Sequence, residues 1–245
     1  ASAAAFTGRV TTPLGEPAAG AMVTVIEPGT ERRETVYTDA AGAFAIRVPY
    51  TGAVRIRARL AGFEDVTVTK TAAEHAPPLT LTFAPFANAE AASDALSASA
   101  FNARLPWPDV KRDRLPFISQ CNYCHQVGNA TTRAPRSHEA WVAVVDKMDE
   151  GLMALLSTPQ KRTVASVLER AFDGRPIQAT QSYGTGPWLA RAKVREWPVG
   201  DGFTFVHDAM VGRDGKLYGT DEGHDLLWIL DRATGAIDKV PFPDI

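Results

Sequence analysis

Cysteine is almost absent from this chain, since only two of its 245 residues are cysteines. Two cysteines cannot build the disulfide network that holds many small secreted domains together. The chain also lacks an apolar run long enough to predict a helix that crosses a membrane. Neither sign of charge predominates, because 26 basic and 28 acidic residues leave a net charge of −2. Without a basic arm or patch, neither nucleic acid nor an anionic membrane is expected as an obligatory partner.

Both cysteines fall within one pentapeptide, Cys121-Asn122-Tyr123-Cys124-His125. This spacing matches the attachment signature of a c-type haem, in which two thiols bond the vinyl groups and a histidine ligates the iron. Two intervening residues place both sulfurs along one turn of chain, with the adjacent imidazole beneath the porphyrin. We therefore expect one covalent haem c, held by Cys121, Cys124 and His125.

Three other interpretations of the cysteine pair are a thioredoxin-type redox pair, half of a zinc site, and chance. A thioredoxin-type pair requires a βαβ surround, and a zinc site requires a second pair of ligands. The sequence offers neither, so the haem interpretation is favoured.

The sixth position on the iron decides the chemistry, because a thioether raises the potential and blocks small ligands, whereas an open position admits them. The order of the haem motif, a helix with Trp141, and then Met148 resembles a bacterial cytochrome c family in which such a helix precedes the axial methionine. The resemblance implies Met148 as the sixth ligand, with Met153 as the alternative, followed by His138 or an open position. The spacing from Trp141 to Met148 is equally typical of an ordinary core methionine.

Residues 105–178 have the periodicity of helices. We expect an entry helix over 116–125, a second helix that Ser137 caps, and a third that Thr158 caps and Gly174 ends. These three helices suit a small mono-haem cytochrome c domain. Arg133 or Arg136 could pair with a haem propionate, although a plain surface charge is favoured for each.

Residues 1–84 consist of short alternating runs separated by turn residues, which is typical of strands. In one run the apolar side chains point one way and the basic side chains the other: Val54, Ile56, Ala58 and Leu60 against Arg55, Arg57 and Arg59. This pattern predicts a sheet with one buried and one exposed face. The arginine row could bind an acidic partner, but a solvated sheet face is the favoured interpretation.

The same segment resembles the carboxypeptidase regulatory-like, transthyretin-like sandwich. The residues that carry the resemblance are Gly8-Arg9-Val10, Gly15 with Pro17, Gly20-Ala21, Val23-Thr24-Val25, Thr38-Asp39, Gly42 with Phe44, and Ala61-Gly62-Phe63. The family implies a sandwich of about seven strands that serves as a docking or spacer module without catalysis. Residues 85–104, rich in alanine, serine and asparagine, are expected to be a linker.

Residues 179–245 return to short strands that recur about every ten residues. His207-Asp208, Asp214-Gly215 and the closing 231–235 resemble the first blade of the streptogramin-lyase-like propellers, which implies an incomplete β-propeller here. One blade cannot bury both of its faces, so either the native chain continues or another chain completes the propeller. His207 and His224 could serve a metal or substrate site, but ordinary strand and turn histidines are favoured.

The expected fold class is therefore multidomain: an all-β sandwich, a small all-α cytochrome c domain, and a partial propeller. The small-residue start, 1–5, resembles the end left by signal-peptide removal, although an artificial boundary would look the same. With the haem motif it indicates a periplasmic or extracellular protein. The favoured function is one-electron transfer to a redox partner protein. The alternatives are a subunit or fragment of a propeller oxidoreductase or lyase, whose catalysis would lie in missing or partner-supplied blades, and a haem-based ligand sensor.

Overall fold

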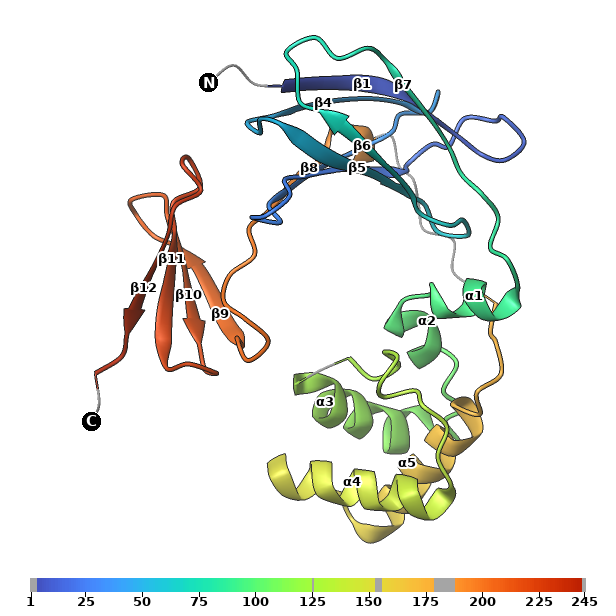
Figure 1. The fold of residues 1–245 in the computed structure, drawn as a ribbon. Coiled ribbons are helices and arrows are strands. Elements are labelled where there is room, and N and C mark those ends of the chain that lie inside the picture. Colours follow the sequence, from blue (N-terminus) through green and yellow to red (C-terminus); the bar gives the residue numbers. More distant parts are fainter. Residues whose placement is uncertain (1–3, 125, 153–155, 179–187, 244–245) are drawn as a thin grey trace. The chain divides into compact units, whose positions relative to one another are not determined.

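The computed structural model describes residues 4–124, 126–152, 156–178 and 188–243. These residues contain three sheets, five α-helices and two short helices of other types (Figure 1). The described residues of 1–59, 65–82 and 186–245 form one compact unit, and those of 60–64 and 83–185 form a second, called the helical unit below. No helix within the described ranges is long and apolar enough to cross a membrane.

Two sheets in the N-terminal part form the expected sandwich. Its first seven strands are β1 (Ala4–Thr11), β2 (Met22–Ile26), β3 (Arg33–Tyr37), β4 (Ala43–Val48), β5 (Ala53–Arg59), β6 (Val66–Thr71) and β7 (Leu79–Thr82). One sheet has the order β4-β1-β7, and the other contains β6-β5-β2-β3. The predicted alternation in β5 is confirmed, because Val54, Ile56 and Ala58 are fully buried. The arginines between them therefore lie on the outer face of the sheet.

The turn between β3 and β4 shows why the sandwich needs particular residues there. The Oδ1 atom of Asp39 accepts hydrogen bonds from the backbone N–H groups of Ala41 and Ala43, at 2.9 and 2.8 Å. Gly42 follows with a φ of 72°, and a Cβ atom there would collide with the carbonyl oxygen of Val10. Only glycine combines this conformation with such close packing.

An eighth strand, β8 (Lys193–Glu196), completes the second sheet by pairing antiparallel with β3. It follows η2, a 3₁₀ turn over Leu189–Arg191. The buried carboxylate of Glu34 on β3 holds β8 in place, because Lys193 Nζ lies 2.5 Å and Arg195 Nε 3.4 Å from its oxygens. The strand thereby covers a sheet edge whose backbone groups would otherwise be unpaired.

The helical unit contains α1 (Ala89–Asp94), α2 (Ala98–Asn102), η1 (Val110–Arg114, a π-helix), α3 (Leu115–Cys124), α4 (His138–Leu152) and α5 (Thr158–Ala171). Its apolar core joins the longer helices with Phe101 of α2 and with Leu105. The expected linker over 85–104 thus contains two short helices, and part of it lies in this core.

Helix starts follow the capping chemistry of the sequence. Ser137 precedes α4, and its Oγ accepts a hydrogen bond from Ala140 N at 3.3 Å. At α5 the cap is Ser157 and not Thr158, since Gln160 Oε1 accepts from Ser157 N at 2.9 Å in a capping box. A glutamine three residues after a serine is the signal that identifies this cap.

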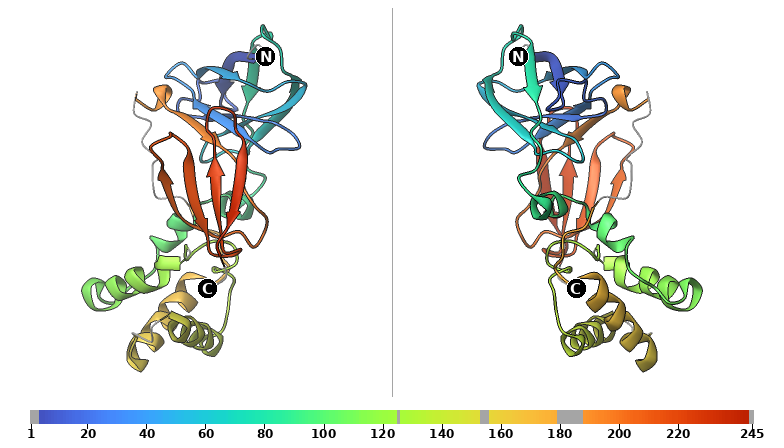
Figure 2. Two further views of the ribbon diagram at one scale, coloured as in Figure 1. Left: turned by 90° about the vertical axis from the view of Figure 1, so that its left-hand side faces the viewer. Right: turned by 90° about the vertical axis from the view of Figure 1, so that its right-hand side faces the viewer.

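The last strands form a separate four-stranded sheet, β12-β11-β10-β9, which Figure 2 shows from two sides. The strands are β9 (Val206–Val211), β10 (Leu217–Asp221), β11 (Leu226–Leu230) and β12 (Ile237–Pro241), and each pairs antiparallel with its neighbour. Both outer strands are exposed along their whole length.

One buried carboxylate organises an end of this sheet. Asp221 is 1% exposed, and its Oδ1 accepts hydrogen bonds from Phe205 N and Gly223 N at 2.8 and 3.0 Å. Its Oδ2 accepts from Trp228 Nε1 at 2.9 Å and lies 3.0 Å from His224 Nδ1. Burial by itself would raise the pKa of Asp221, but these hydrogen bonds outweigh it and lower the pKa to about 2.

The expected fold class is wrong. Among the described residues, twelve strands in three sheets dominate over five α-helices of at most 15 residues, and no group of three or more His, Cys, Asp or Glu side chains could hold a metal ion. The cytochrome c domain was inferred from helical periodicity, which predicts helices but not how they pack. The partial propeller was inferred from evenly spaced strands, yet the first of them, β8, belongs to the sandwich sheet.

Candidate functional site

Helix α3 carries the cysteine pair of the haem motif. Pro116 lies in its first turn, where a missing backbone N–H costs little. Phe117 is buried, and Ile118 and Cys121 are partly buried against the core of the helical unit. Positions 121 and 124 are one turn apart, so they lie near each other along the helix. The side chain of Cys124 and all of His125 lie outside the described residues.

The Cys121 thiol is held in its neutral form. Burial raises the pKa of Cys121 to about 11, and the negative charge of Asp149 adds to this effect. Redox-active and zinc-binding cysteines show the opposite shift, because they react or bind as thiolates. This environment is unfavourable for a thioredoxin-type pair, and within the described residues no group of three or more metal-ligating side chains supports the zinc interpretation.

Hydrogen bonds anchor the chain on either side of His125. The Oδ1 of Asn122 accepts from Val127 N at 3.3 Å and from Asn102 Nδ2 at 3.4 Å. Asn102 Nδ2 also donates to Val127 O at 3.3 Å. Next, Gly128 has a φ of 107°, and a Cβ atom there would press on the carbonyl oxygen of Ala98. The segment after the motif is therefore fixed against α2.

Met148 on α4 is 46% exposed. A methionine that merely fills a core would be buried, so this position does not fit the ordinary interpretation of its spacing from Trp141. The other methionine candidate, Met153, lies outside the described residues.

Asp149, beside Met148, joins α4 to α5. It is 7% exposed, and its Oδ1 accepts from Leu156 N at 3.1 Å. Lys161 Nζ lies 3.0 Å from Asp149 Oδ2 and 3.1 Å from Asp146 Oδ1. The ion pairs of Asp149 were not predicted from the sequence. A carboxylate four residues after Val145, on the apolar face of the helix, is nevertheless a signal for a buried ion pair.

His138 and Met148 lie towards opposite ends of α4, about 15 Å apart along the axis at about 1.5 Å per residue. His138 Nδ1 lies 3.3 Å from Glu169 Oε2 on α5, so its imidazole already contacts a carboxylate. The charge of Asp149 raises the pKa of Cys121, so Cys121 lies near the end of α4 that carries Met148. Figure 1 also shows the C-terminal ends of α3 and α4 on the same side of the helical unit. Met148 is therefore the better placed candidate.

Two indole N–H groups in this unit lack an acceptor among the residues that the structure describes. Trp107 Nε1 and Trp141 Nε1 are both buried and have no hydrogen-bond partner within the described ranges. Trp107 packs on Phe117 of α3, with ring centroids 4.7 Å apart. Buried donors are normally satisfied, so each of these two could accommodate an acceptor from a bound group.

The arginines after the motif have partners in the protein. Arg133 Nη2 lies 2.8 Å from Asp94 Oδ1, and its guanidinium stacks 4.1 Å from the ring centroid of Phe101. Arg136 stacks 4.6 Å from the ring centroid of Trp141. Both arginines thus pack on aromatic rings of the helical unit.

The two histidines of the four-stranded sheet bind carboxylates of their own surroundings. His207 Nδ1 lies 3.2 Å from Asp208 Oδ2 and 3.7 Å from Glu222 Oε1. His224 Nε2 lies 3.3 Å from Asp201 Oδ1, while its Nδ1 faces Asp221. These contacts fit the favoured interpretation of structural strand and turn histidines.

Comparison with known proteins identifies one part of the chain. Residues 5–85 match the model of the carboxypeptidase regulatory-like domain family. The N-terminal sandwich is therefore a carboxypeptidase regulatory-like domain, as the resemblance implied. No curated protein matches the chain.

Several solved structures are similar to part of the chain. One of them is the Bacillus anthracis TIE protein, at 17% identity over 34% of this chain and 16% of that one. The match thus spans well under two thirds of that protein. Its TM-score of 0.27 is too low to carry an argument about fold or function.

Proposed function

We propose that this protein carries one covalently bound haem c in its helical unit and transfers single electrons to a redox partner protein. The observation that carries the proposal is the pair of cysteines one turn apart on α3, followed directly by His125. Because haem of this type is attached outside the cytoplasmic membrane in bacteria, we also propose a periplasmic or extracellular location.

The residues on α3 suit thioether attachment. Cys121 and Cys124 would each bond one vinyl group, and His125 would ligate the iron. When bound, such a haem exchanges one electron between the ferrous and ferric states of its iron. The partly buried, neutral thiol of Cys121 supports this use of the pair over thiolate chemistry.

Met148 is the proposed sixth ligand. Its exposed thioether is free to meet a bound group, and Asp149 fixes that turn of α4 through Lys161 and Leu156. A thioether ligand would raise the potential and close the sixth position to small molecules. These properties suit an electron carrier better than a ligand sensor.

The surroundings of α3 fit a group with an apolar body and polar edges. Partly buried Ile118 and Cys121 offer apolar contacts. The unpartnered indole N–H groups of Trp107 and Trp141 could donate to carboxylates such as those of haem. Both indoles belong to the helical unit that contains the motif.

The attachment is tested on the full chain produced in a host that attaches haem c. After denaturation the polypeptide should keep its colour, and its intact mass should exceed the sequence mass by one haem. Cys121→Ala with Cys124→Ala should abolish both signals, whereas His207→Ala, a control in the four-stranded sheet, should leave them unchanged. A colourless denatured chain with two free thiols would refute the proposal.

The sixth ligand is tested by spectroscopy of the ferric protein. A weak absorption band near the far-red end reports methionine ligation, and it should disappear in Met148→Ala. Met153→Ala and His138→Ala should keep the band. If Met153→Ala alone removes it, the assignment to Met148 is wrong. If the untreated protein binds carbon monoxide readily, the sixth position is open and the sensor function is favoured.

A further inference from the structure

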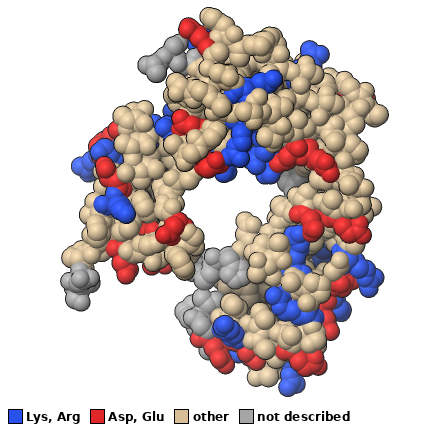
Figure 3. Space-filling view, in the orientation of Figure 1, with Lys and Arg blue, Asp and Glu red and all other residues tan. Residues whose placement is uncertain are grey.

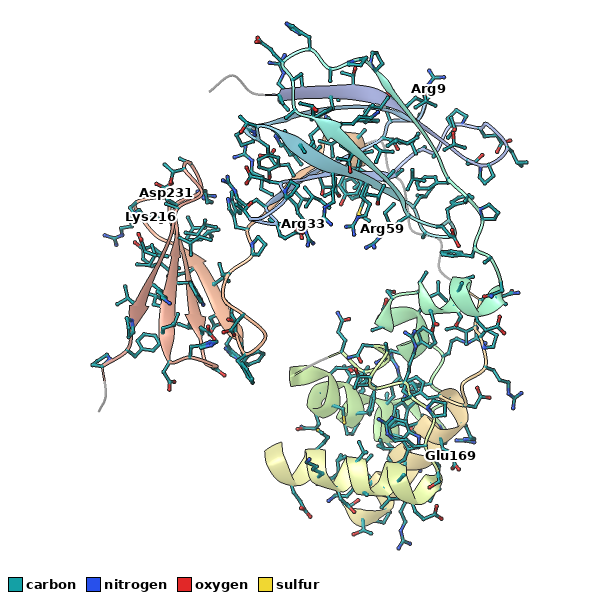
Figure 4. All side chains as sticks on the ribbon, in the orientation of Figure 1. Arg9, Arg33, Arg59, Glu169, Lys216 and Asp231 are labelled. Atoms are coloured by element: carbon teal, nitrogen blue, oxygen red, sulfur yellow. The ribbon has the colours of Figure 1, made fainter. Side chains whose placement is uncertain are left out.

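The outer face of the five-stranded sheet carries a row of arginines. The strand register places Arg55 beside Ile26, Arg57 beside Thr24 and Arg59 beside Met22. Arg33 of β3 lies on the other side of Ile26. Because directly opposed residues share a face, all four arginines project from the same side. Figure 4 shows Arg33 and Arg59 pointing away from the sandwich on this side, called the arginine face below.

Three carboxylates share this face with the four guanidinium groups: Glu31, Asp65 and Glu196, which the register places opposite Arg33. Glu31 lies 2.5 Å from Arg55 and 3.8 Å from Arg33. Asp65 lies 2.8 Å from Arg59 but 3.9 Å from Arg57. Basic side chains consequently gather on this side of the sandwich, with acidic ones at the margin (Figure 3). The arginine face thus has an excess of one positive charge, and the ion pair of Arg57 with Asp65 has the longest of these distances.

Like charges lie close to the guanidinium group of Arg57. Burial lowers the pKa of Arg57, and the charges of Arg59 and Arg33 lower it further, against the opposing effect of Asp65 and Glu196. Such crowding is relieved when an anion binds between the cations.

Three guanidinium donors on this face have no acceptor within hydrogen-bond distance among the described residues. The Nε atoms of Arg33, Arg55 and Arg57 are buried and make no hydrogen bond within the described part of the chain. Beneath them, the hydroxyls of Thr24 and Thr35 satisfy each other at 2.8 Å and are themselves buried. The Nε atoms themselves are covered, but the side chains of Arg33, Arg55 and Arg57 are 28–43% exposed, so the outer parts of their guanidinium groups can donate to an anionic group.

The spacing of the arginines indicates the shape of the ligand. Arg55, Arg57 and Arg59 alternate along β5, so they repeat at about 6.8 Å and span about 14 Å. An extended peptide with a carboxylate on every second residue has the same repeat. We propose that the arginine face binds an extended acidic segment of a partner protein, with Arg57 at the centre of the contact. This proposal is independent of the haem.

The charge balance favours a protein over a nucleic acid. The chain has a net charge of −2, and the carboxylates of Glu31 and Asp65 lie at the margin of the arginine face. A continuous phosphate chain would be repelled by them, whereas a peptide can leave neutral residues opposite them.

The proposal is tested on the full chain with a synthetic peptide that alternates glutamate and threonine, by calorimetry at low and moderate salt. Arg57→Gln should weaken binding by about tenfold, because a charge-assisted contact at the centre is lost. Arg57→Lys should weaken it less, since it keeps the charge but not the planar fork of donors. Arg9→Gln is the matched control, because Arg9 lies on β1 in the other sheet (Figure 4).

The comparison peptides separate shape from charge. A peptide with the same composition but contiguous glutamates should bind more weakly, and one with lysine in place of glutamate should not bind. An equal loss in Arg9→Gln, stronger binding of a single-stranded oligonucleotide, or no binding of the alternating peptide would each overturn the proposal. Unchanged thermal unfolding of each variant shows that the fold is kept.

Discussion

The sandwich and the four-stranded sheet are both built from short antiparallel strands, yet they are stabilised differently. In the sandwich, apolar residues such as Phe6, Val23 and Ile56 are fully buried. In the four-stranded sheet, the best buried apolar residues, Leu226 and Leu230, are each 8% exposed, and the most buried side chain is Asp221. Two facing sheets can remove alternate residues from water, while a sheet whose two outer strands are exposed relies more on hydrogen bonds.

In the four-stranded sheet, the hydrogen bonds of Asp221 hold separate segments of the chain together. They tie the loop before β9 and the turn after β10 to β11, through Phe205, Gly223 and Trp228. A buried carboxylate is unfavourable unless its lone pairs are satisfied, and here four donors or potential donors surround it. The comparison therefore predicts that truncating an apolar side chain lowers stability most in the sandwich. Removing one charge should lower stability most in the four-stranded sheet.

The largest effect is expected from truncating the sandwich core. Phe6→Ala should lower the free energy of unfolding of the sandwich by about 3–5 kcal/mol, through lost burial and a cavity. Phe203→Ala, at a residue that is 81% exposed, should change stability by less than about 0.5 kcal/mol. Urea denaturation of the full chain measures both. Equal effects would mean that Phe203 is covered in solution and that the comparison fails.

A smaller effect with a distinct pH dependence is expected from Asp221→Asn. The native pKa of about 2 lies below the unfolded value of about 3.9. The carboxylate therefore contributes stability that is fully present above about pH 4 and is lost as the pH falls towards 2. The stability difference between wild type and Asp221→Asn should shrink over that range.

Denaturation midpoints between about pH 6 and pH 2 measure this difference. Asp238→Asn, at an exposed position of the neighbouring β12, is the control and should show no such trend. A difference between wild type and Asp221→Asn that is constant with pH would contradict the role assigned to the charge.

The smallest effect is expected where the C-terminal part joins the sandwich. Glu34→Gln removes the charge that Lys193 and Arg195 contact, and should cost about 1–2 kcal/mol. Hydrogen exchange should accelerate at the backbone of β8 but not in β9–β12. Glu16→Gln, in an exposed turn, serves as the control. Unchanged exchange in β8 would show that backbone pairing alone holds the strand.

Local patterns predicted much of this structure. The alternation in β5 and the positions of α3, α4 and α5 agree with the sequence to within a few residues. Each depends on residues close together in the chain, where propensity and capping act. The match of residues 5–85 to the carboxypeptidase regulatory-like family agrees with the resemblance found there.

Contacts between distant segments were not predicted. The pairing of β8 with β3 joins residues from the two ends of the chain, and the evenly spaced strands instead suggested a propeller. The bonds of Asp149 to Lys161 and Leu156, and the burial of Asp221, were likewise missed. A polar residue on a periodic pattern does not reveal which partner satisfies it.

By itself, the amino-acid sequence determined where the strands of the sandwich and the three longer helices form, that an arginine row alternates with an apolar row on β5, and that two cysteines precede a histidine. Only the tertiary structure decided which edge β8 covers, which carboxylates are buried, and which arginine donors remain without acceptors. The physical reason is that dihedral preferences and side-chain periodicity act over a few residues, whereas burial and hydrogen-bond satisfaction depend on whichever distant segment packs against them.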